Sequence, residues 1–534
     1  MVRSKACDLT GAPTMDKIAA LTTFIISAIH DISPRHDLKD VLLSIEKDSL
    51  QADLDALGLL PHLLSCPRDG ADQLLSLIAQ YCSAKEVIMG VQEVVERLRT
   101  ESGEEVDGSS EEVSLVVQVI RLMLLLKKAF PRLVPRKSPS QTLAWLAELE
   151  QLMSLVTTQA TVAESRSLVR NAALLVQELG AWVRGKAGSN ITELTTSYTF
   201  LTSFLDVTLE SCADLLQSYV AQREFEICFP RLSYRSIIPG DWQDGQDVVL
   251  LSLDVSSSLG RSFDTLQSNP TLASMVLIAH AHALPPIHFN LSLLVSILPV
   301  ILTSLHSNIA LDASLAILLK VLCAAPLTHG ELSSDFIIPL TTVLPWLCSA
   351  HPDASTRHIT LRILSQVLHL TPSVLRLQIL RDLLSPSEYL SPYMRVTAIG
   401  LVKEAILDTI GPYVFRLDLD SPHTLASITG VDAFDDSPEP ARLVECLGLY
   451  YILLLRDVDN RTGIRDLGTV QSIESSLLRP IRSVLSKWAR DFEVLPSTAA
   501  ALQISLERVD DALRTIAGAF VPSGDVRVPV PTFK

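Results

Sequence analysis

Three histidines, His280, His282 and His288, form the nearest approach to a metal-binding pattern in this sequence. Neutral imidazole nitrogens are common metal ligands, and residues at alternate positions could share one coordination sphere. The spacing falls where a predicted helix meets a loop, however, so the side chains at i and i+2 diverge, and no acidic or thiol ligand is near in sequence. We expect structural histidines here, with no bound metal and no cofactor.

The sequence lacks the motifs that most often carry catalysis. It contains no G-x-x-x-x-G-K-[ST] or G-x-G-x-x-G loop for phosphates, no G-x-S-x-G turn and no H-E-x-x-H helix. We therefore expect a protein that is not an enzyme, with no catalytic residues and no small-molecule substrate. A catalytic site of unfamiliar design is the alternative.

The thiols and the N-terminal residues favour a cytoplasmic protein. The eight cysteines are Cys7, Cys66, Cys82, Cys212, Cys228, Cys323, Cys348 and Cys446, and no two of them form a C-x-x-C pair. Several lie inside apolar runs, which is typical of reduced cysteines that act as small hydrophobic residues. The first 17 residues lack the apolar run and cleavage site of a signal peptide. A nuclear location stays open, because the connector 127–137 is basic.

Net charge points to protein partners. The chain carries a formal charge of −16 and has an isoelectric point near 5.2. Affinity for nucleic acids depends largely on Lys and Arg side chains that neutralise phosphates. We therefore expect no nucleic-acid partner, whereas a basic patch on a protein partner would suit this chain.

The clearest architecture lies in residues 334–411, where apolar residues recur at helical spacing. One predicted helix has its apolar stripe at Leu340, Val343, Leu344 and Leu347. Pro352 then stops the helix, and Asp353 and Ser355 offer side-chain oxygens to the N–H groups of the next one. That helix has its apolar face at Ile359, Ile363, Leu364, Val367, Leu368 and Leu370. Two further runs, one from Val374 to Leu384 and one that starts at Ser391, complete a second helix pair.

These helix pairs predict an all-α fold, specifically a HEAT- or armadillo-like α-solenoid in two helical blocks. Arg357 and Arg395 occupy similar places near the starts of the second and fourth helices, 38 positions apart, close to one repeat period. The same unit recurs upstream at 293–305 and 308–322. Neighbouring repeats must stack to bury their apolar faces, and the stack leaves extended surfaces that suit macromolecular partners.

Breaks in the helical pattern divide the chain. We expect an N-terminal helical block at 1–228 with a mobile acidic loop at 100–112, and an irregular connector at 229–247. A C-terminal HEAT-like block follows at 248–520 with an acidic loop at 418–440, and a flexible tail occupies 521–534.

One interval could suggest a membrane. No Asp, Glu, Lys or Arg occurs between Asp264 and Asp312. The longest apolar run there, 289–305, contains Pro299 and is short for a span, which needs about 20 residues. No Lys/Arg cluster flanks it to set an orientation. We expect a buried helix pair and no membrane contact, with a membrane-associated scaffold as the alternative.

The best candidates for partner contacts are basic residues of the repeats. Arg357, Arg395 and Lys403 could form an exposed ridge that meets an acidic partner. Alternatively, Asp353 and Arg357 form an i, i+4 pair that orders the start of a helix. Trp346 and Trp488 lie in apolar runs, so we expect both in the core.

The runs PWLCSAHPDASTRHITLRILSQVL, LQILRDLL and SPYMRVTAIGLVKEAI carry a family likeness. Together they resemble the C-terminal region of the family that groups glomulin, its plant lateral-root counterpart and the fungal YAP-binding proteins. The resemblance implies a non-enzymatic solenoid that binds proteins. Glomulin-type members cap the RING subunit of cullin-based ubiquitin ligases and block recruitment of the ubiquitin-conjugating enzyme. YAP-binding members instead partner a stress-responsive transcription factor, and both functions stay open.

Overall fold

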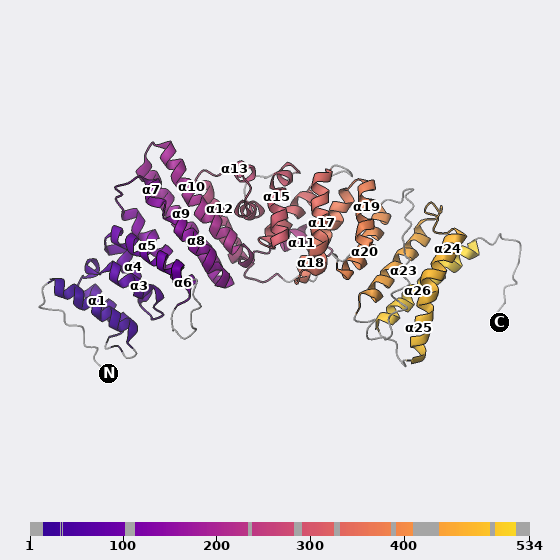
Figure 1. Ribbon diagram of the computed structural model, residues 1–534, viewed down its shortest axis with the longest axis horizontal. Coiled ribbons are helices and arrows are strands. Elements are labelled where there is room, and N and C mark those ends of the chain that lie inside the picture. Colours follow the sequence, from indigo (N-terminus) through magenta and orange to yellow (C-terminus); the bar gives the residue numbers. More distant parts are fainter. Residues whose placement is uncertain are drawn as a thin grey trace, which may run out of the picture. The chain divides into compact units, whose positions relative to one another are not determined.

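The computed structural model of this chain describes residues 14–31, 34, 36–101, 113–232, 238–281, 291–324, 332–385, 391–408, 437–491 and 497–519. Every regular element within these ranges is helical, and none of them is a strand (Figure 1). The predicted all-α class of stacked helix pairs is confirmed. The chain separates into two compact parts, which we call unit 1 (Met1–Ala325) and unit 2 (Pro326–Lys534).

Unit 1 consists of helices of varied length. Its helices are α1 Thr14–His30, α2 Leu38–Lys47, α3 Ala56–Ser65, α4 Ala71–Tyr81, α5 Ala84–Glu101, α6 Leu115–Ala129, α7 Pro139–Leu143, α8 Leu146–Val156, α9 Val162–Ala187, α10 Ile191–Cys212, α11 Val220–Cys228, α12 Trp242–Ser258, α13 Phe263–Ser268, α14 Leu272–His280, α15 Leu291–Ser307 and α16 Leu311–Ala324. Of these, α9 and α10 are the longest described.

Helix α9 is central to the packing of unit 1. It contacts α6, α10 and α12, which lie alongside it in Figure 1. Its start is fixed by a capping box, in which Thr161 Oγ1 accepts from the Glu164 N–H at 3.3 Å while Glu164 Oε2 accepts from the Thr161 N–H at 2.9 Å. Its core-facing side includes six apolar residues that are completely buried, namely Leu168, Val169, Ala172, Leu175, Val176 and Leu179.

The irregular segment that we expected to separate two blocks, 229–247, falls inside unit 1. Arg166 of α9 explains this placement, because its Nη1 lies 2.8 Å from Asp241 Oδ2 and its Nε donates to the Leu216 carbonyl at 3.0 Å. Helix α12 then starts at Trp242 and packs on α9. The end of this segment, from Asp241 onward, is therefore tied to α9, whereas residues 233–237 lie outside the described residues.

A second difference concerns residues 194–221, whose helical spacing by itself predicts one continuous helix. The structure ends α10 at Cys212 and starts α11 at Val220. Gln217 and Tyr219, between the two helices, both have φ near +50°, a left-handed conformation that interrupts a helix. Asp312 then supplies the acceptors for the first N–H groups of α11.

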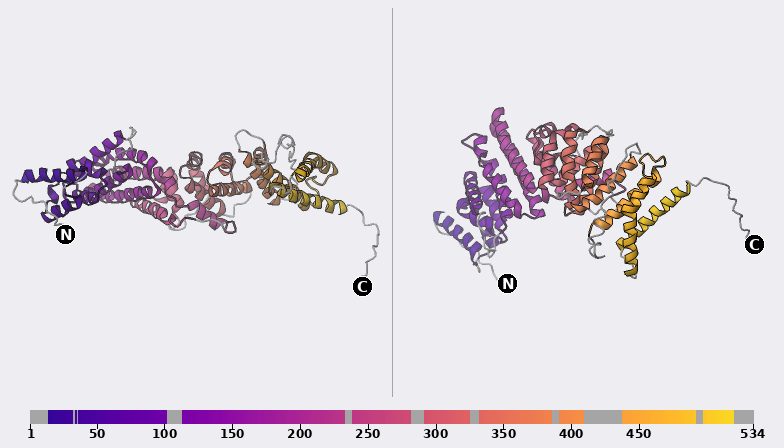
Figure 2. Two further views of the ribbon diagram at one scale, coloured as in Figure 1. Left: turned by 90° about the horizontal axis from the view of Figure 1, so that it is seen from below. Right: turned by 45° about the vertical axis from the view of Figure 1, so that its right-hand side comes forward.

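Unit 2 consists of helix pairs followed by a C-terminal group. Its helices are α17 Ser334–Ala350, α18 Ala354–Leu370, α19 Ser373–Leu384, α20 Pro392–Asp408, α23 Glu439–Arg456, α24 Leu467–Ile473, α25 Arg479–Asp491 and α26 Ser497–Ala519, with a π-helical turn at Glu474–Leu478. Helix α17 packs on α18, α19 on α20, α20 on α23, and α23 on α26. Figure 2 shows these helices from two further directions. The two helix pairs predicted from residue 334 onward are confirmed.

Parts of the predicted loops lie outside the described residues. Of the acidic loop expected at 100–112, residues 102–112 lie outside, and residues 100 and 101 belong to α5. Of the loop expected at 418–440, residues 418–436 lie outside, and α23 begins at Glu439. The tail at 521–534 lies outside entirely.

Candidate functional site

Helix α17 has two sharply different faces. Its inner face carries the predicted stripe, with Leu340, Leu344 and Leu347 completely buried and Val343 6% exposed. The N-cap of the following helix is also confirmed, since Asp353 Oδ2 accepts a hydrogen bond from the Thr356 N–H at 2.7 Å. The α17–α18 pair is thus stabilised by the buried apolar stripe of α17 and by the Asp353 N-cap of α18.

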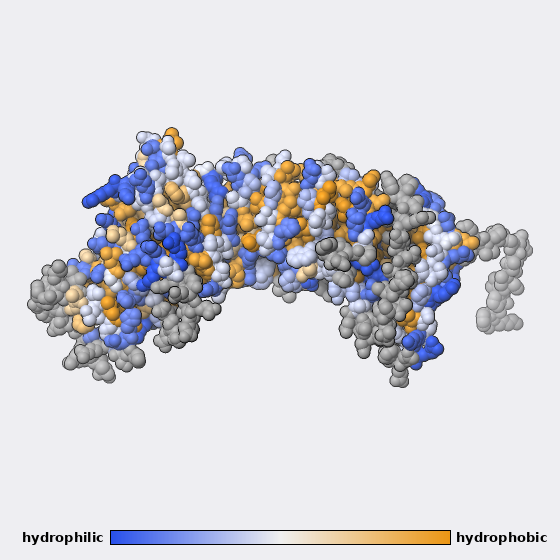
Figure 3. All heavy atoms as spheres, in the orientation of Figure 1, coloured by the Kyte–Doolittle hydropathy of each residue, from blue (hydrophilic) through white to orange (hydrophobic). Residues whose placement is uncertain are grey.

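The outer face of α17 is formed by Asp335, Ile338, Thr342 and Trp346, all of which are exposed. Ile338 exposes 52% of its surface and Trp346 exposes 46%. Hydrophobic residues, orange in Figure 3, reach the surface among polar ones in the region of α17 and α19. The prediction that Trp346 is a core residue is therefore wrong, whereas Trp488 on α25 is 8% exposed as expected.

The position of Trp346 could have been inferred from its spacing. It lies outside the stripe of Leu340, Val343, Leu344 and Leu347, so a helix that buries this stripe must turn Trp346 outward. An exposed tryptophan on a rigid helix is costly to hydrate and is enriched at the centres of protein interfaces. The outer face of α17 is thus the strongest candidate contact surface in unit 2.

Arg357, the first residue of the predicted ridge, lies where α17 is joined to α18. Its Nη1 donates to the carbonyl oxygens of His351 at 2.6 Å and Pro352 at 2.8 Å. The guanidinium therefore satisfies carbonyls of the preceding turn, and the expected pair with Asp353 is replaced by these contacts. Arg357 thus helps to order the turn.

Arg395 and Lys403, the other two ridge residues, are both on α20 and near α23. Lys403 Nζ lies 3.2 Å from Glu445 Oε2, with the two side chains 31% and 35% exposed. The positive charge of Arg395 is close enough to Cys446 to oppose the rise in the pKa of that thiol, which burial dominates. Arg357 therefore faces the turn between α17 and α18, whereas Arg395 and Lys403 face α23. The role of the three residues in partner binding stays a prediction.

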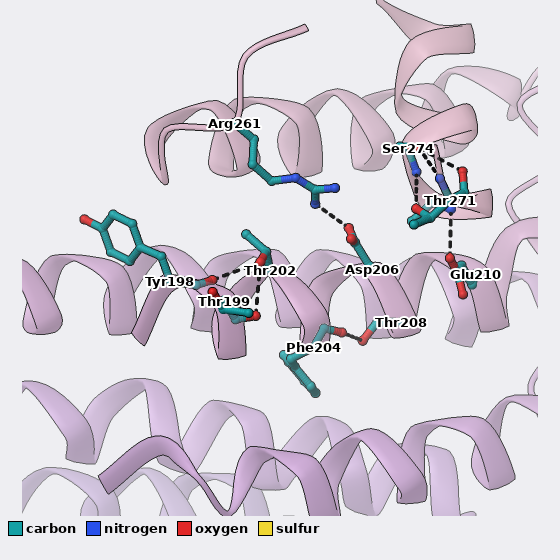
Figure 4. A network of polar contacts seen from close by, with 11 residues as sticks. Tyr198, Thr199, Thr202, Phe204, Asp206, Thr208, Glu210, Arg261, Thr271 and Ser274 are labelled. Carbon is teal, nitrogen blue, oxygen red and sulfur yellow. Dashed lines mark hydrogen bonds and ion pairs between the residues drawn. The ribbon is translucent and has the colours of Figure 1, made fainter. Parts of the chain in front are cut away.

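A polar network in unit 1 connects α10 to the elements that follow α12 (Figure 4). Asp206 Oδ1 lies 2.7 Å from Arg261 Nη1, and each side chain is 17% exposed. Glu210 Oε1 accepts from the Ala273 N–H of α14 at 3.2 Å. Burial raises the pKa of both carboxyl groups, more than the Arg261 charge and the backbone bond lower them. Because each carboxylate has a specific internal partner, this network is structural.

Of the three histidines in the predicted pattern, the structure describes only His280. His280 is buried, with Nδ1 2.8 Å from the Val276 carbonyl oxygen and Nε2 2.8 Å from Ser218 Oγ. His282 and His288 lie outside the described residues. Among the residues that the structure describes, no three His, Cys, Asp or Glu side chains cluster as metal ligands.

The charge-free interval folds mainly as α14 and α15, with residues 282–290 between them outside the description. None of the described helices combines the length and the hydropathy that a bilayer span requires.

Comparison with known families places residues 280–494 in a match to the model of the family described as YAP/Alf4/glomulin. The resemblance drawn from the sequence is confirmed for this part of the chain, which includes the outer face of α17. The match supports a helical protein that binds other proteins. No curated protein matches the chain.

Proposed function

We propose that this chain is a non-enzymatic binding protein that regulates a cullin-RING ubiquitin ligase by covering its RING subunit. The match of residues 280–494 to a family that includes glomulin supports the choice of partner. The observation that carries the proposal is the outer face of α17, where Ile338 and Trp346 are exposed on a helix whose opposite face is locked in the core.

The proposed mechanism is exclusion. A RING domain recruits its ubiquitin-conjugating enzyme through a small surface, so a helix face that occupies this surface prevents recruitment without any chemical step. Trp346 would supply a large apolar contact with few rotatable bonds, which keeps the entropy cost of ordering it low. Binding would then be centred on Trp346, with Ile338 about two turns away on the same face.

Charge supports the same kind of partner. The net charge of −16 would favour encounter with a RING subunit that presents a basic rim, mainly through the association rate. The outer face of α17 carries Asp335 and no Lys or Arg among its exposed residues, so it would not repel such a rim.

A ubiquitin-chain assay tests this function. Adding the purified chain to a cullin ligase with its conjugating enzyme should suppress chain formation in proportion to occupancy of the RING subunit. Excess conjugating enzyme should restore activity, because the two proteins compete for one surface. Binding without loss of chain formation would contradict the proposal, and capture of an extended transcription-factor segment in place of the RING subunit would favour the other branch of the family.

The predicted ridge can be tested separately with a charge swap. The double variant K403E/E445K reverses the charge at position 403 yet preserves the ion pair between α20 and α23. If Lys403 contacts an acidic group of the partner, as the ridge predicts, binding should weaken while the melting temperature stays close to that of the wild type. Unchanged binding would remove Lys403 from the interface.

A further inference from the structure

Helices α11 and α16 pack along their lengths and share a series of polar contacts. At the start of both helices, Asp312 Oδ2 accepts from the Val220 N–H at 2.8 Å. Further along, Lys320 Nζ lies 3.8 Å from Glu224 Oε1. From the first contact to the second, the residue numbers increase along both helices. The two helices are therefore parallel, and their C-terminal ends meet.

Two cysteines face each other at these C-terminal ends. Cys228 is the last residue of α11, Cys323 is the last but one of α16, and a hydrogen bond joins their side chains. The spacing of α11 residues 220, 224 and 228 explains the facing, because residues four apart lie on one side of a helix. Ninety-five positions separate the two thiols in sequence, so the fold alone brings them together.

Accessibility distinguishes this pair from the other described cysteines. Cys228 and Cys323 are partly exposed, whereas the remaining described thiols are buried, namely Cys66, Cys82, Cys212, Cys348 and Cys446. Burial raises the pKa of Cys82 and Cys446 to about 11 and that of Cys212 and Cys348 to about 12. These four thiols are therefore protonated and poorly reactive at neutral pH.

In contrast to these buried thiols, Cys228 has a lowered pKa, and the cause is its hydrogen bond with Cys323. This bond lowers the pKa against the opposing effects of burial and of the Glu224 carboxylate. The same bond, followed by burial, raises the pKa of Cys323. One thiol is thus stabilised as a thiolate and its neighbour holds the proton, which is the arrangement of an attacking and a resolving cysteine.

We propose that Cys228 and Cys323 form a peroxide-sensitive modification site that closes to a reversible disulfide between α11 and α16. The Cys228 thiolate attacks one oxygen of hydrogen peroxide, the O–O bond breaks, and the leaving hydroxide takes up a proton to give water and a sulfenic acid. Cys323 sulfur then attacks the Cys228 sulfur and the S–O bond breaks. The released hydroxide takes the Cys323 proton, so two thiols are oxidised while one peroxide is reduced to two waters.

The test uses the full chain and hydrogen peroxide. After treatment with one equivalent of peroxide, free thiols are alkylated in denaturant, and the protein is digested with trypsin and a Glu-specific protease. Cleavage after Glu331 separates Cys323 from Cys348, so that mass spectrometry can assign the bond. The expected product is a Cys228–Cys323 cross-linked peptide that dithiothreitol cleaves, with six of the eight cysteines alkylated.

Two variants test the order of the steps. In C323S, Cys228 should stop at the sulfenic acid and be trapped by dimedone, whereas in C228S, Cys323 should stay alkylatable. Thermal melts of the reduced variants check their folding, and the wild-type cross-link decides the proposal even if a variant is unstable. Full alkylation of both thiols after peroxide, or a disulfide that joins either thiol to another cysteine, would overturn it.

Discussion

The carboxylate of Asp312, on the first turn of α16, accepts hydrogen bonds from the N–H groups of Val220 at 2.8 Å and Ala221 at 2.9 Å. Val220 is the first residue of α11, so the cap of one helix is supplied by the start of another that lies 92 positions away in sequence. Desolvation raises the pKa of this carboxyl, while the two backbone bonds and Ser218 lower it. This contact fixes where α11 begins.

We predict that D312A destabilises unit 1 by about 3 kcal/mol, because two N–H groups at the start of α11 lose their acceptor in a desolvated site. The melting temperature should fall, and hydrogen exchange should accelerate in peptides that contain Val220 and Ala221. The matched control is D254A, at an exposed position of α12. Equal exchange in D312A and the wild type would show that the cap does not hold α11.

Lys320 should make stability depend on pH in the alkaline range. Burial lowers its pKa from 10.5 to about 8, against the opposing charge of Glu224. Between these values the unfolded chain binds more protons than the folded one. The free energy of unfolding therefore rises as the pH rises from about 8 to 10.5, and this gain is lost again as the pH falls back to about 8.

The measurement compares melting temperatures of the wild type and K320M/E224Q across this range. The double variant is the reference because K320M alone would leave the buried Glu224 carboxylate without the Lys320 charge. The wild type should gain up to about 3 kcal/mol relative to the reference as the pH rises. Parallel pH profiles would show that Lys320 titrates normally in the folded protein.

Gly245 should be intolerant of any side chain. A Cβ atom there would lie 2.2 Å from the Leu216 carbonyl oxygen, a backbone atom that cannot move without disturbing the α10–α11 connection. We expect G245A to cost about 2 kcal/mol in an unfolding titration. In G185A on α9, a Cβ would meet no atom within 4 Å, so stability should stay equal or rise by up to about 1 kcal/mol. Equal effects of the two substitutions would contradict this contact.

Local pattern predicted the repeats well because their determinants are close in sequence. The stripe through Leu340 and Leu347 and the cap at Asp353 each depend on residues within two helical turns. The start of α11 was missed for the opposite reason. Its determinants are left-handed Gln217 and Tyr219 and the distant carboxylate of Asp312, and no periodicity signals any of them.

The features of the candidate site also divide into those that local spacing predicts and those that depend on tertiary packing. The exposure of Trp346 follows from the apolar stripe of α17, which is present in the sequence, because Trp346 lies outside that stripe. The placement of Arg395 and Lys403 beside α23 depends on tertiary packing between helices more than 40 residues apart, as in the 42-residue separation of Lys403 and Glu445. The pairing of Cys228 with Cys323 has the same origin.

The affinity of the purified chain for the RING subunit of a cullin ligase, measured by titration calorimetry for the wild type and W346A, tests the central claim most directly. We predict micromolar or tighter binding by the wild type and at least tenfold weaker binding by W346A, a loss of about 1.4 kcal/mol or more. I191A, which truncates a side chain that is 76% exposed in unit 1, should bind as the wild type does. Absence of wild-type binding, or equal affinities for the wild type and W346A, would contradict the account.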